Sequence, residues 1–192
     1  IIPSDKTNGG IIAQIPVLFG QDDKLQKVIQ VKSSQKLEPQ DVDNFIRLQD
    51  SEYYKSADES TKKVLDAKGT LWISKEPVQV TKNNATFQNA TNGMMNSESD
   101  AIKNGITQTH KAGDKGINMT QNYNPTHGFI GDLLESSVDK FGGTTGMAEQ
   151  TGEFTRDVTT ARGDKGSNFA NHSQGNPLFQ RGVEYIKSKG DY

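Results

Sequence analysis

The sequence predicts an α/β or α+β fold, with a small sheet and flanking helices, a strand–turn–helix elbow at residues 168–188 and a mixed N-terminal region. Two observations favour this class of fold. In the second half of the chain, strand-like and helix-like segments follow one another in the order strand, helix, helix, strand, helix. Two of the predicted strands end in turns that carry a histidine, at 124–128 and 171–175. If these strands are parallel, both turns lie at the edge of the sheet where ligands bind.

Composition restricts the class of protein. The chain of 192 residues allows one or two domains, and a hydrophobic fraction of 31% allows only a modest core. The net charge of −2 provides no general attraction for nucleic acid or anionic membranes, and no apolar run is long enough to span a membrane. Because the chain has no cysteine, disulfides, thiol catalysis and cysteine-ligated zinc are excluded.

The first half of the chain gives a mixed pattern. Its predicted elements are, in order, a strand at 28–31, a helix from 37 to about 53, a helix at 58–68 and paired strands at 70–73 and 78–80. Pro39 suits the first turn of a helix, and Gly69 ends the next one. Asn, Gln, Ser and Gly dominate residues 82–99, which are therefore predicted as a loop or domain boundary. We thus expect an N-terminal region at 1–94, a linker or delivery-related segment, and a separate C-terminal domain at 95–192.

The second half is more regular. Its predicted elements are a short helix at 100–104 ended by Gly105, a strand at 116–123, a helix at about 129–141, a helix at about 145–161, a strand at 168–172 and a helix at 177–188 opened by Pro177. A right-handed crossover connects the two strands if they are parallel.

The turn after the last strand has the pattern of a nucleophile elbow. Ser173 stands on a sharp turn between strand and helix, and Gly175 keeps the second glycine of Gly-x-Ser-x-Gly, while Asn171 replaces the first. In a serine hydrolase of that fold the acid and the histidine follow the serine, whereas here no histidine follows it. Only His127 or His110, both upstream, could act as the base. A lipase-like or esterase-like hydrolase that uses Ser173 remains one alternative.

A ribonuclease requires fewer unusual arrangements of these residues than a serine hydrolase does. RNA supplies its own nucleophile, the 2′-OH, so a metal-independent enzyme needs a base, an acid and hydrogen-bond donors or cations around the phosphate. The candidate catalytic residues are His172 as general acid or base, Ser173 as a partner of the phosphate or the 2′-OH, and His127 and Arg162 as transition-state partners. The candidate RNA-binding residues are Lys165, Arg156, Asn171 and Asn176.

Each of these side chains also has a structural interpretation. His127 can cap the following helix, His172 can simply end the strand, and the lysines and arginines can belong to a solvated surface of mixed charge. The sequence contains no dense cluster of carboxylates and histidines suited to Mg²⁺ or Zn²⁺. We therefore expect no metal and no cofactor.

Three segments of the chain resemble segments of a known family, and they occur in the same order. Tyr123–Ser136 reads YNPTHGFIGDLLES, Thr159–Gly163 reads TTARG, and Ser167–Asn176 reads SNFANHSQGN. These segments, within residues 95–188, resemble the carboxyl-terminal regions of very large bacterial surface proteins, the filamentous haemagglutinins and contact-dependent growth inhibition effectors.

The resemblance implies a toxin that is displayed or secreted as part of a larger protein and acts in the cytoplasm of a neighbouring cell, where a cognate immunity protein neutralises it. The most similar subset cleaves the acceptor end of transfer RNA and depends on elongation factor Tu, sometimes with elongation factor Ts. A host factor that holds the RNA suits a domain with so little positive charge. On this resemblance His172 is the first catalytic candidate. A second alternative is a non-catalytic delivery or binding module.

Overall fold

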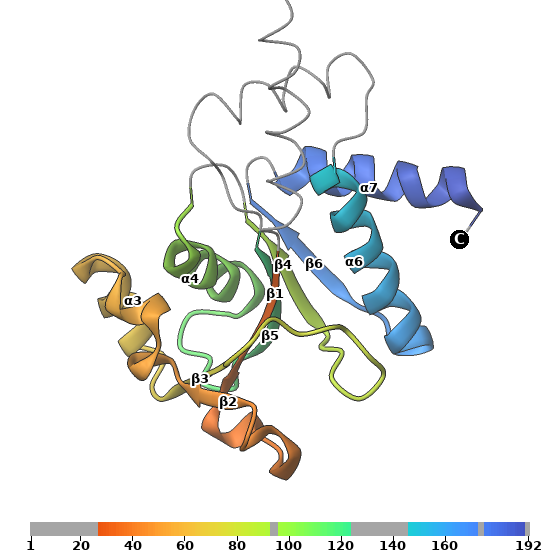
Figure 1. Cartoon of the computed structure of the whole chain (residues 1–192). Coiled ribbons are helices and arrows are strands. Elements are labelled where there is room, and N and C mark those ends of the chain that lie inside the picture. Colours follow the sequence, from red (N-terminus) through yellow and green to blue (C-terminus); the bar gives the residue numbers. More distant parts are fainter. Residues whose placement is uncertain (1–26, 93–95, 124–145, 173–174, 191–192) are drawn as a thin grey trace, which may run out of the picture.

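A computed structural model describes residues 27–92, 96–123, 146–172 and 175–190 (Figure 1). A six-stranded mixed sheet forms its centre, flanked by helices on both faces, so the α/β class is confirmed. The strands are β1 (Lys27–Ser33), β2 (Phe45–Arg47), β3 (Leu71–Ser74), β4 (Gln88–Thr91), β5 (Asn118–Tyr123) and β6 (Asn168–Asn171). The α-helices are α2 (Glu52–Lys55), α3 (Glu59–Asp66), α4 (Glu98–Thr109), α6 (Gly146–Arg162) and α7 (Gly175–Lys189).

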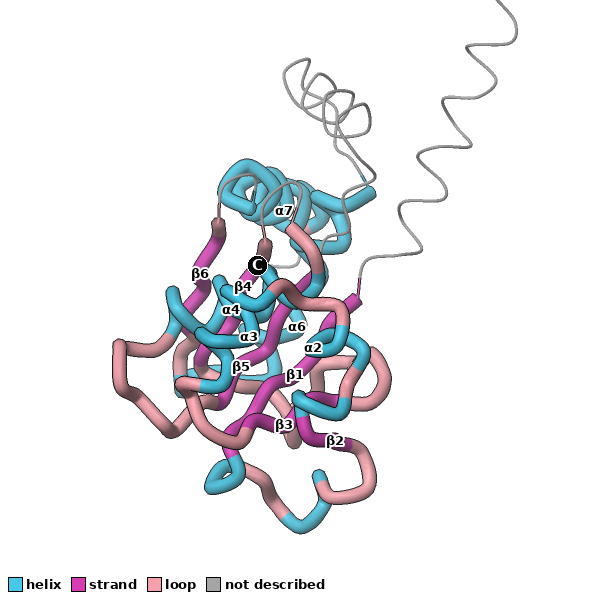
Figure 2. The backbone as a smooth tube through the Cα atoms, turned by 90° about the vertical axis from the view of Figure 1, so that its left-hand side faces the viewer, coloured by secondary structure: helices cyan, strands magenta, loops and turns pink. Residues whose placement is uncertain are grey.

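The sheet combines an antiparallel and a parallel half. Its strand order is β2-β3-β1-β5-β4-β6. The strands from β2 to β5 pair antiparallel, whereas β4 is parallel to both of its neighbours, β5 and β6. Strands β5 and β6 are therefore parallel, the case that the sequence analysis left conditional, although β4 separates them. Figure 2 shows these strands side by side, with α7 across one end of the sheet.

Helices α4 and α6 cover opposite faces of the sheet. Gly105 of α4 lies against Ala90, Met119 and the side chain of Gln121. The next residue of β5, Asn122, donates a hydrogen bond from Nδ2 to Thr151 Oγ1 of α6 over 3.4 Å. Because successive side chains of a strand point to opposite faces, α4 and α6 lie on different sides (Figure 1).

The two faces of the sheet differ in chemistry. The face toward α3 and α4 holds the apolar core, whose largest members are Ile29, Val31, Leu48, Leu65, Leu71, Ile73, Ile102, Ile106, Ile117 and Met119. The opposite face is polar but also buried. There, Thr86 Oγ1 and Thr120 Oγ1 are 2.7 Å apart, and Gln30 Nε2 donates to Asn84 O over 2.6 Å. Buried amides and hydroxyls need such partners, and they let a sequence with few apolar residues bury both faces of the sheet.

Helices α6 and α7 cross at two glycines. A Cβ atom on Gly152 would lie 2.5 Å from the carbonyl oxygen of Gly182, so only glycine permits this approach of the two backbones. Phe169 of β6 packs between the same helices, with ring centroids 6.4 Å from Phe154 and 5.5 Å from Phe179. These contacts fix the start of α7 relative to the end of β6.

The sequence prediction was wrong about three segments in the first half, 37–53, 78–80 and 82–99. Instead of a helix from 37 to 53, the chain forms a short 3₁₀ helix at Pro39–Asp41, strand β2, a second 3₁₀ helix at Leu48–Asp50 and α2. Phe45 is buried because it pairs in the sheet, opposite Ser74, while Val42 is 65% exposed. The apolar residues therefore do not share one helical face, and pairing with β3 overrides the local periodicity.

Residues 82–99, predicted as a loop, contain β4 and the start of α4. The amide of Asn89 is fully buried and donates to the carbonyl oxygens of Thr86 and Phe87, both over 3.1 Å, so a polar strand is stable inside the sheet. Residues 78–80 form no strand. Gly105 lies within α4 rather than ending it, and the predicted helix at 129–141 lies outside the described residues.

The expected boundary at residue 94 does not separate two folded units among the described residues. Strand β5 of the C-terminal region lies between β1 and β4, which both belong to the N-terminal region. The described parts of 1–94 and 95–192 therefore share one sheet. The other predicted strands and helices of the described chain are confirmed within about two residues, as β1, β3, β5, β6, α3, α6 and α7, whereas α4 extends five residues beyond its predicted end.

Candidate functional site

The parallel strands end together at one edge of the sheet. Thr91 at the end of β4 is in register with Asn122 of β5 and with Asn171 of β6. From β4 the chain continues to α4 on one face, whereas β5 is followed by α6 on the other. Adjacent parallel strands whose connections go to opposite faces form a topological switch point, and open α/β sheets bind ligands outside the strand ends there. The carboxyl edge of β5, β4 and β6 is therefore the candidate site.

His172 is the titratable group that β6 delivers to this edge. Its backbone N–H donates to the carbonyl oxygen of Thr91 over 3.1 Å, and its side chain is exposed. Beside it, the Oδ1 atom of Asn171 is buried and has no hydrogen-bond partner among the described residues. The sheet thus fixes the backbone that carries the imidazole while leaving the ring accessible to a ligand.

The strand and the helix of the expected elbow are both present. Strand β6 ends at Asn171, and α7 begins at Gly175, two residues earlier than predicted. Ser173, the 124–128 turn with His127, and the side chain of Asn176 lie outside the described residues. The described ends of β5 and β6 do meet the same edge, as the sequence predicted.

Arg162 and Lys165 do not reach His172. Helix α6 ends at Arg162, at the amino end of β6, while His172 follows the carboxyl end; the four residues of β6 span about 13 Å. The Arg162 guanidinium donates to the carbonyl oxygens of Gly166 and, over 3.5 Å, Ala85 and Lys165. Arg162 therefore holds loops together, and the expectation that it is a transition-state partner of His172 is corrected.

His110 is also removed from the site. It follows α4, at the amino end of β5; its Nε2 accepts from the Asn118 N–H over 3.3 Å, and its Nδ1 is 2.8 Å from Thr109 Oγ1. Since the Thr109 hydroxyl donates to Gly105 O, the imidazole donates from Nδ1 and is neutral. Burial also lowers the pKa of His110. Both nitrogens are occupied at the opposite edge, so His110 cannot activate Ser173.

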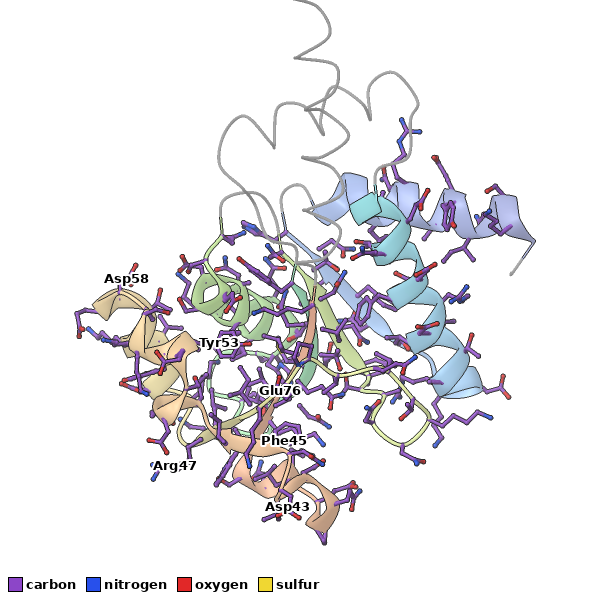
Figure 3. The ribbon with its side chains drawn as sticks, viewed as in Figure 1. Asp43, Phe45, Arg47, Tyr53, Asp58 and Glu76 are labelled. Carbon is purple, nitrogen blue, oxygen red and sulfur yellow. The ribbon has the colours of Figure 1, made fainter. Side chains whose placement is uncertain are left out.

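A lysine between two tyrosines lies at the carboxyl edge, and the sequence did not reveal it. Lys27 opens β1 opposite Tyr123, and its Nζ lies 5.3 Å from the ring centroid of Tyr53 and 5.8 Å from that of Tyr123. It also forms an ion pair with Glu98 at the start of α4. Tyr53 comes from α2 and is labelled in Figure 3. Burial lowers the pKa of Lys27, but its interactions with Glu98 and Tyr53 together outweigh burial and raise the pKa overall, so Lys27 stays cationic.

The phenol of Tyr123 is expected to lose its proton at a higher pH than an ordinary tyrosine. Burial first, then the negative charge of Glu98 and the neighbouring Tyr53, raises its pKa to about 12. Because this value lies above that of an unfolded tyrosine, about 10, the neutral phenol stabilises the folded state below pH 10 and this contribution is lost as the pH rises toward 12. Absorbance at alkaline pH should show this late tyrosine in the parent protein but not in Tyr123→Phe. If difference titration of the two proteins gives a pKa near 10, Tyr123 is not buried at this edge.

Comparison with known proteins finds no matching family model, no similar curated protein and no similar solved structure. Among the described residues, no three His, Asp or Glu side chains are grouped in a way that could hold a metal ion. No described helix combines the length and apolar character needed to cross a membrane.

Proposed function

We propose that this protein is a metal-independent ribonuclease that acts as a toxin of interbacterial competition, with its active site at the carboxyl edge of β5, β4 and β6. The observation that carries the proposal is the exposed His172, held by its backbone beside Thr91 where ligands bind to sheets of this kind. The resemblance of residues 95–188 to the toxin regions of contact-dependent growth inhibition effectors supports the biological role.

The proposed reaction is an internal phosphoryl transfer. The 2′-oxygen of a ribose attacks the neighbouring phosphorus, the bond from phosphorus to the 5′-oxygen breaks, and a 2′,3′-cyclic phosphate and a 5′-hydroxyl result. His172 either takes the 2′-OH proton or gives a proton to the departing 5′-oxygen, and water carries out the other proton transfer. Asn171 and Ser173, its neighbours in the elbow, bind the phosphate or the 2′-OH.

Lys27 replaces Arg162 as the cation of the proposed site. Strand β1 is three strands away from β6, about 14 Å across the sheet. At that distance Lys27 contacts a more distant phosphate of the RNA than the one that is cleaved. Because its charge is balanced by Glu98, Lys27 offers this phosphate a hydrogen-bond donor rather than a net positive charge.

The partners follow from the toxin hypothesis. We propose transfer RNA, cut near its acceptor end, as the substrate and a cognate immunity protein as the inhibitor. Elongation factor Tu, with or without elongation factor Ts, would hold the RNA for a domain that attracts it weakly. The toxin would reach the cytoplasm of its target cell from a larger secreted or surface-displayed protein.

A serine hydrolase is the second candidate, because Ser173 comes two residues before the start of α7 in the sequence, and the free N–H groups at a helix start could bind an oxyanion. This candidate needs His127 as its base, since His110 is occupied at the opposite edge. A fluorophosphonate probe distinguishes the two candidates: we expect no labelling of Ser173, and stoichiometric labelling would favour the hydrolase.

Expression of the chain in a bacterial cytoplasm without an immunity protein tests the toxin proposal. The whole of residues 1–192 should be expressed, because β1 and β4 belong to the same sheet as β5 and β6. We expect growth arrest together with transfer RNA fragments on a denaturing gel. Arrest with intact RNA contradicts the ribonuclease, and normal growth with folded protein indicates a non-catalytic delivery or binding module.

A further inference from the structure

An open groove lies between α6 and the loop before β4, away from the carboxyl edge. Its volume is about 560 Å³, and its walls are the segment Gln79–Lys82 and the carboxyl-terminal half of α6, from Arg156 to Ala161. Figure 1 shows the loop before β4 beside this part of α6. The groove is near the amino end of β6, where α6 ends, whereas His172 follows the carboxyl end of the same strand.

The groove and its surroundings concentrate positive charge. Lys82 and Arg156 line it, and Arg162 and Lys165 follow at its end along the chain, on α6 and the short 3₁₀ helix Gly163–Lys165. Three carboxylates lie on the same part of the chain: Glu153, Asp157, which pairs with Arg156 over 3.2 Å, and Asp164. These four cations and three carboxylates leave a local excess of one positive charge, in contrast with the net charge of −2 for the whole chain. A local patch of this kind is what an acidic chain needs in order to bind a polyanion.

Arg162 gives this surface a fixed shape and an aromatic platform. By donating to Ala85 O and Gly166 O, its guanidinium connects the loop before β4 to the loop before β6. The same guanidinium lies 5.5 Å from the ring centroid of Phe87, which is 49% exposed. Exposed aromatic rings next to cations are the surfaces on which the unpaired bases of single-stranded nucleic acids stack.

We propose that this groove binds the backbone of a single-stranded segment of the RNA, with Lys82 and Arg156 on its phosphates and Phe87 stacked on a base. The proposal rests on the proposed ribonuclease function and names the substrate-binding surface for it. The groove lies near the amino end of β6, whose four residues span about 13 Å, so nucleotides bound in it are a few positions from a phosphate at His172. Arg156 and Lys165 thus contribute to binding RNA but not to the chemical step.

The test measures binding separately from cleavage. In a His172→Ala background, which leaves the probe uncut, fluorescence anisotropy follows a labelled single-stranded oligoribonucleotide of 20 nucleotides over a range of salt concentrations. Lys82→Ala should weaken binding and reduce the slope of log K against log salt by about 0.7, the contribution of one phosphate contact in a single strand. Phe87→Ala should raise the Kd about fivefold or more, as expected for the loss of one stacked base.

Lys111→Ala is the matched control, because it removes the same charge from an exposed position outside the groove. The groove proposal is overturned if the Lys82 and Phe87 variants bind RNA as the control does. It is also overturned if polyglutamate competes as well as RNA does, since the groove then recognises acidic protein. Cleavage by the protein with His172 intact is scored separately: a protein that binds RNA through the groove but never cuts it keeps this inference and refutes the ribonuclease.

Discussion

Replacing His172 by alanine should lower the rate of RNA cleavage about 10²- to 10⁴-fold, the usual contribution of a positioned general acid or base. The loss should fall on the rate of the chemical step and not on RNA binding, because the exposed ring takes no part in the groove near α6. The thermal midpoint should stay close to that of the parent, since the backbone N–H of residue 172 still donates to Thr91 O. Single-turnover cleavage of transfer RNA, with thermal unfolding measured in parallel, checks both expectations.

His110→Ala is the matched control for that experiment. It removes the same side chain at the opposite edge of the sheet, where the imidazole is hydrogen-bonded through both nitrogens. This variant should lose stability, about 1 kcal/mol for each hydrogen bond, yet cleave RNA at nearly the parental rate while folded. If His110→Ala is inactive and His172→Ala is active, the active site does not lie at the carboxyl edge of β5, β4 and β6.

Replacing Gly152 by alanine should cause a large loss of stability. The new methyl group would lie 2.5 Å from the oxygen and 2.9 Å from the Cα of Gly182, and backbone atoms cannot move aside as a side chain can. Overpacking of this kind costs about 1–3 kcal/mol, which lowers the thermal midpoint of a domain of this size by roughly 2–12 °C. Because α7 follows the elbow directly, cleavage by the folded variant should also decrease.

Thr159→Ala provides the comparison on the same helix. Thr159 is exposed, and its hydroxyl donates only to Thr155 O within α6. Alanine has the higher helix propensity, so this variant should be as stable as the parent within about 0.5 kcal/mol. Calorimetry of the two variants decides the matter: equal midpoints would show that α6 and α7 do not cross at Gly152.

Local sequence patterns were sufficient to predict the helices and strands that have a periodic apolar pattern or a residue that marks their end. The β6–turn–α7 elbow could be predicted because its strand, turn residues and helix are contiguous, and Phe169 and Phe179 meet across it. Strand β4 could not be predicted, because it is polar and its stability depends on partners distant in sequence. Asn89, for example, also donates to Asn168 O, 79 residues away.

The same limit explains what was missed at the site. Lys27, Tyr53, Glu98 and Tyr123 come from four different elements, and no local pattern indicates that they meet. Because β4 was not predicted, the switch point between β4 and β5 could not be predicted either. Arg162 was placed near His172 because the two are close in sequence, but the strand between them carries them to opposite edges. The basic residues expected to bind RNA are instead grouped near the groove, where Lys82 joins them.

The chemical identity of the RNA ends tests the proposed activity most directly. The purified chain would be incubated with transfer RNA in two parallel reactions, one with elongation factor Tu in Mg²⁺ buffer and one without the factor in EDTA, and the fragments analysed by mass spectrometry. A 2′-OH attack assisted by His172 requires no metal and leaves a 2′,3′-cyclic phosphate on one fragment and a 5′-hydroxyl on the other. We expect these ends from the parent and none from His172→Ala. Intact RNA, or fragments that form only with Mg²⁺ and carry a 5′-phosphate, would contradict the proposed ribonuclease.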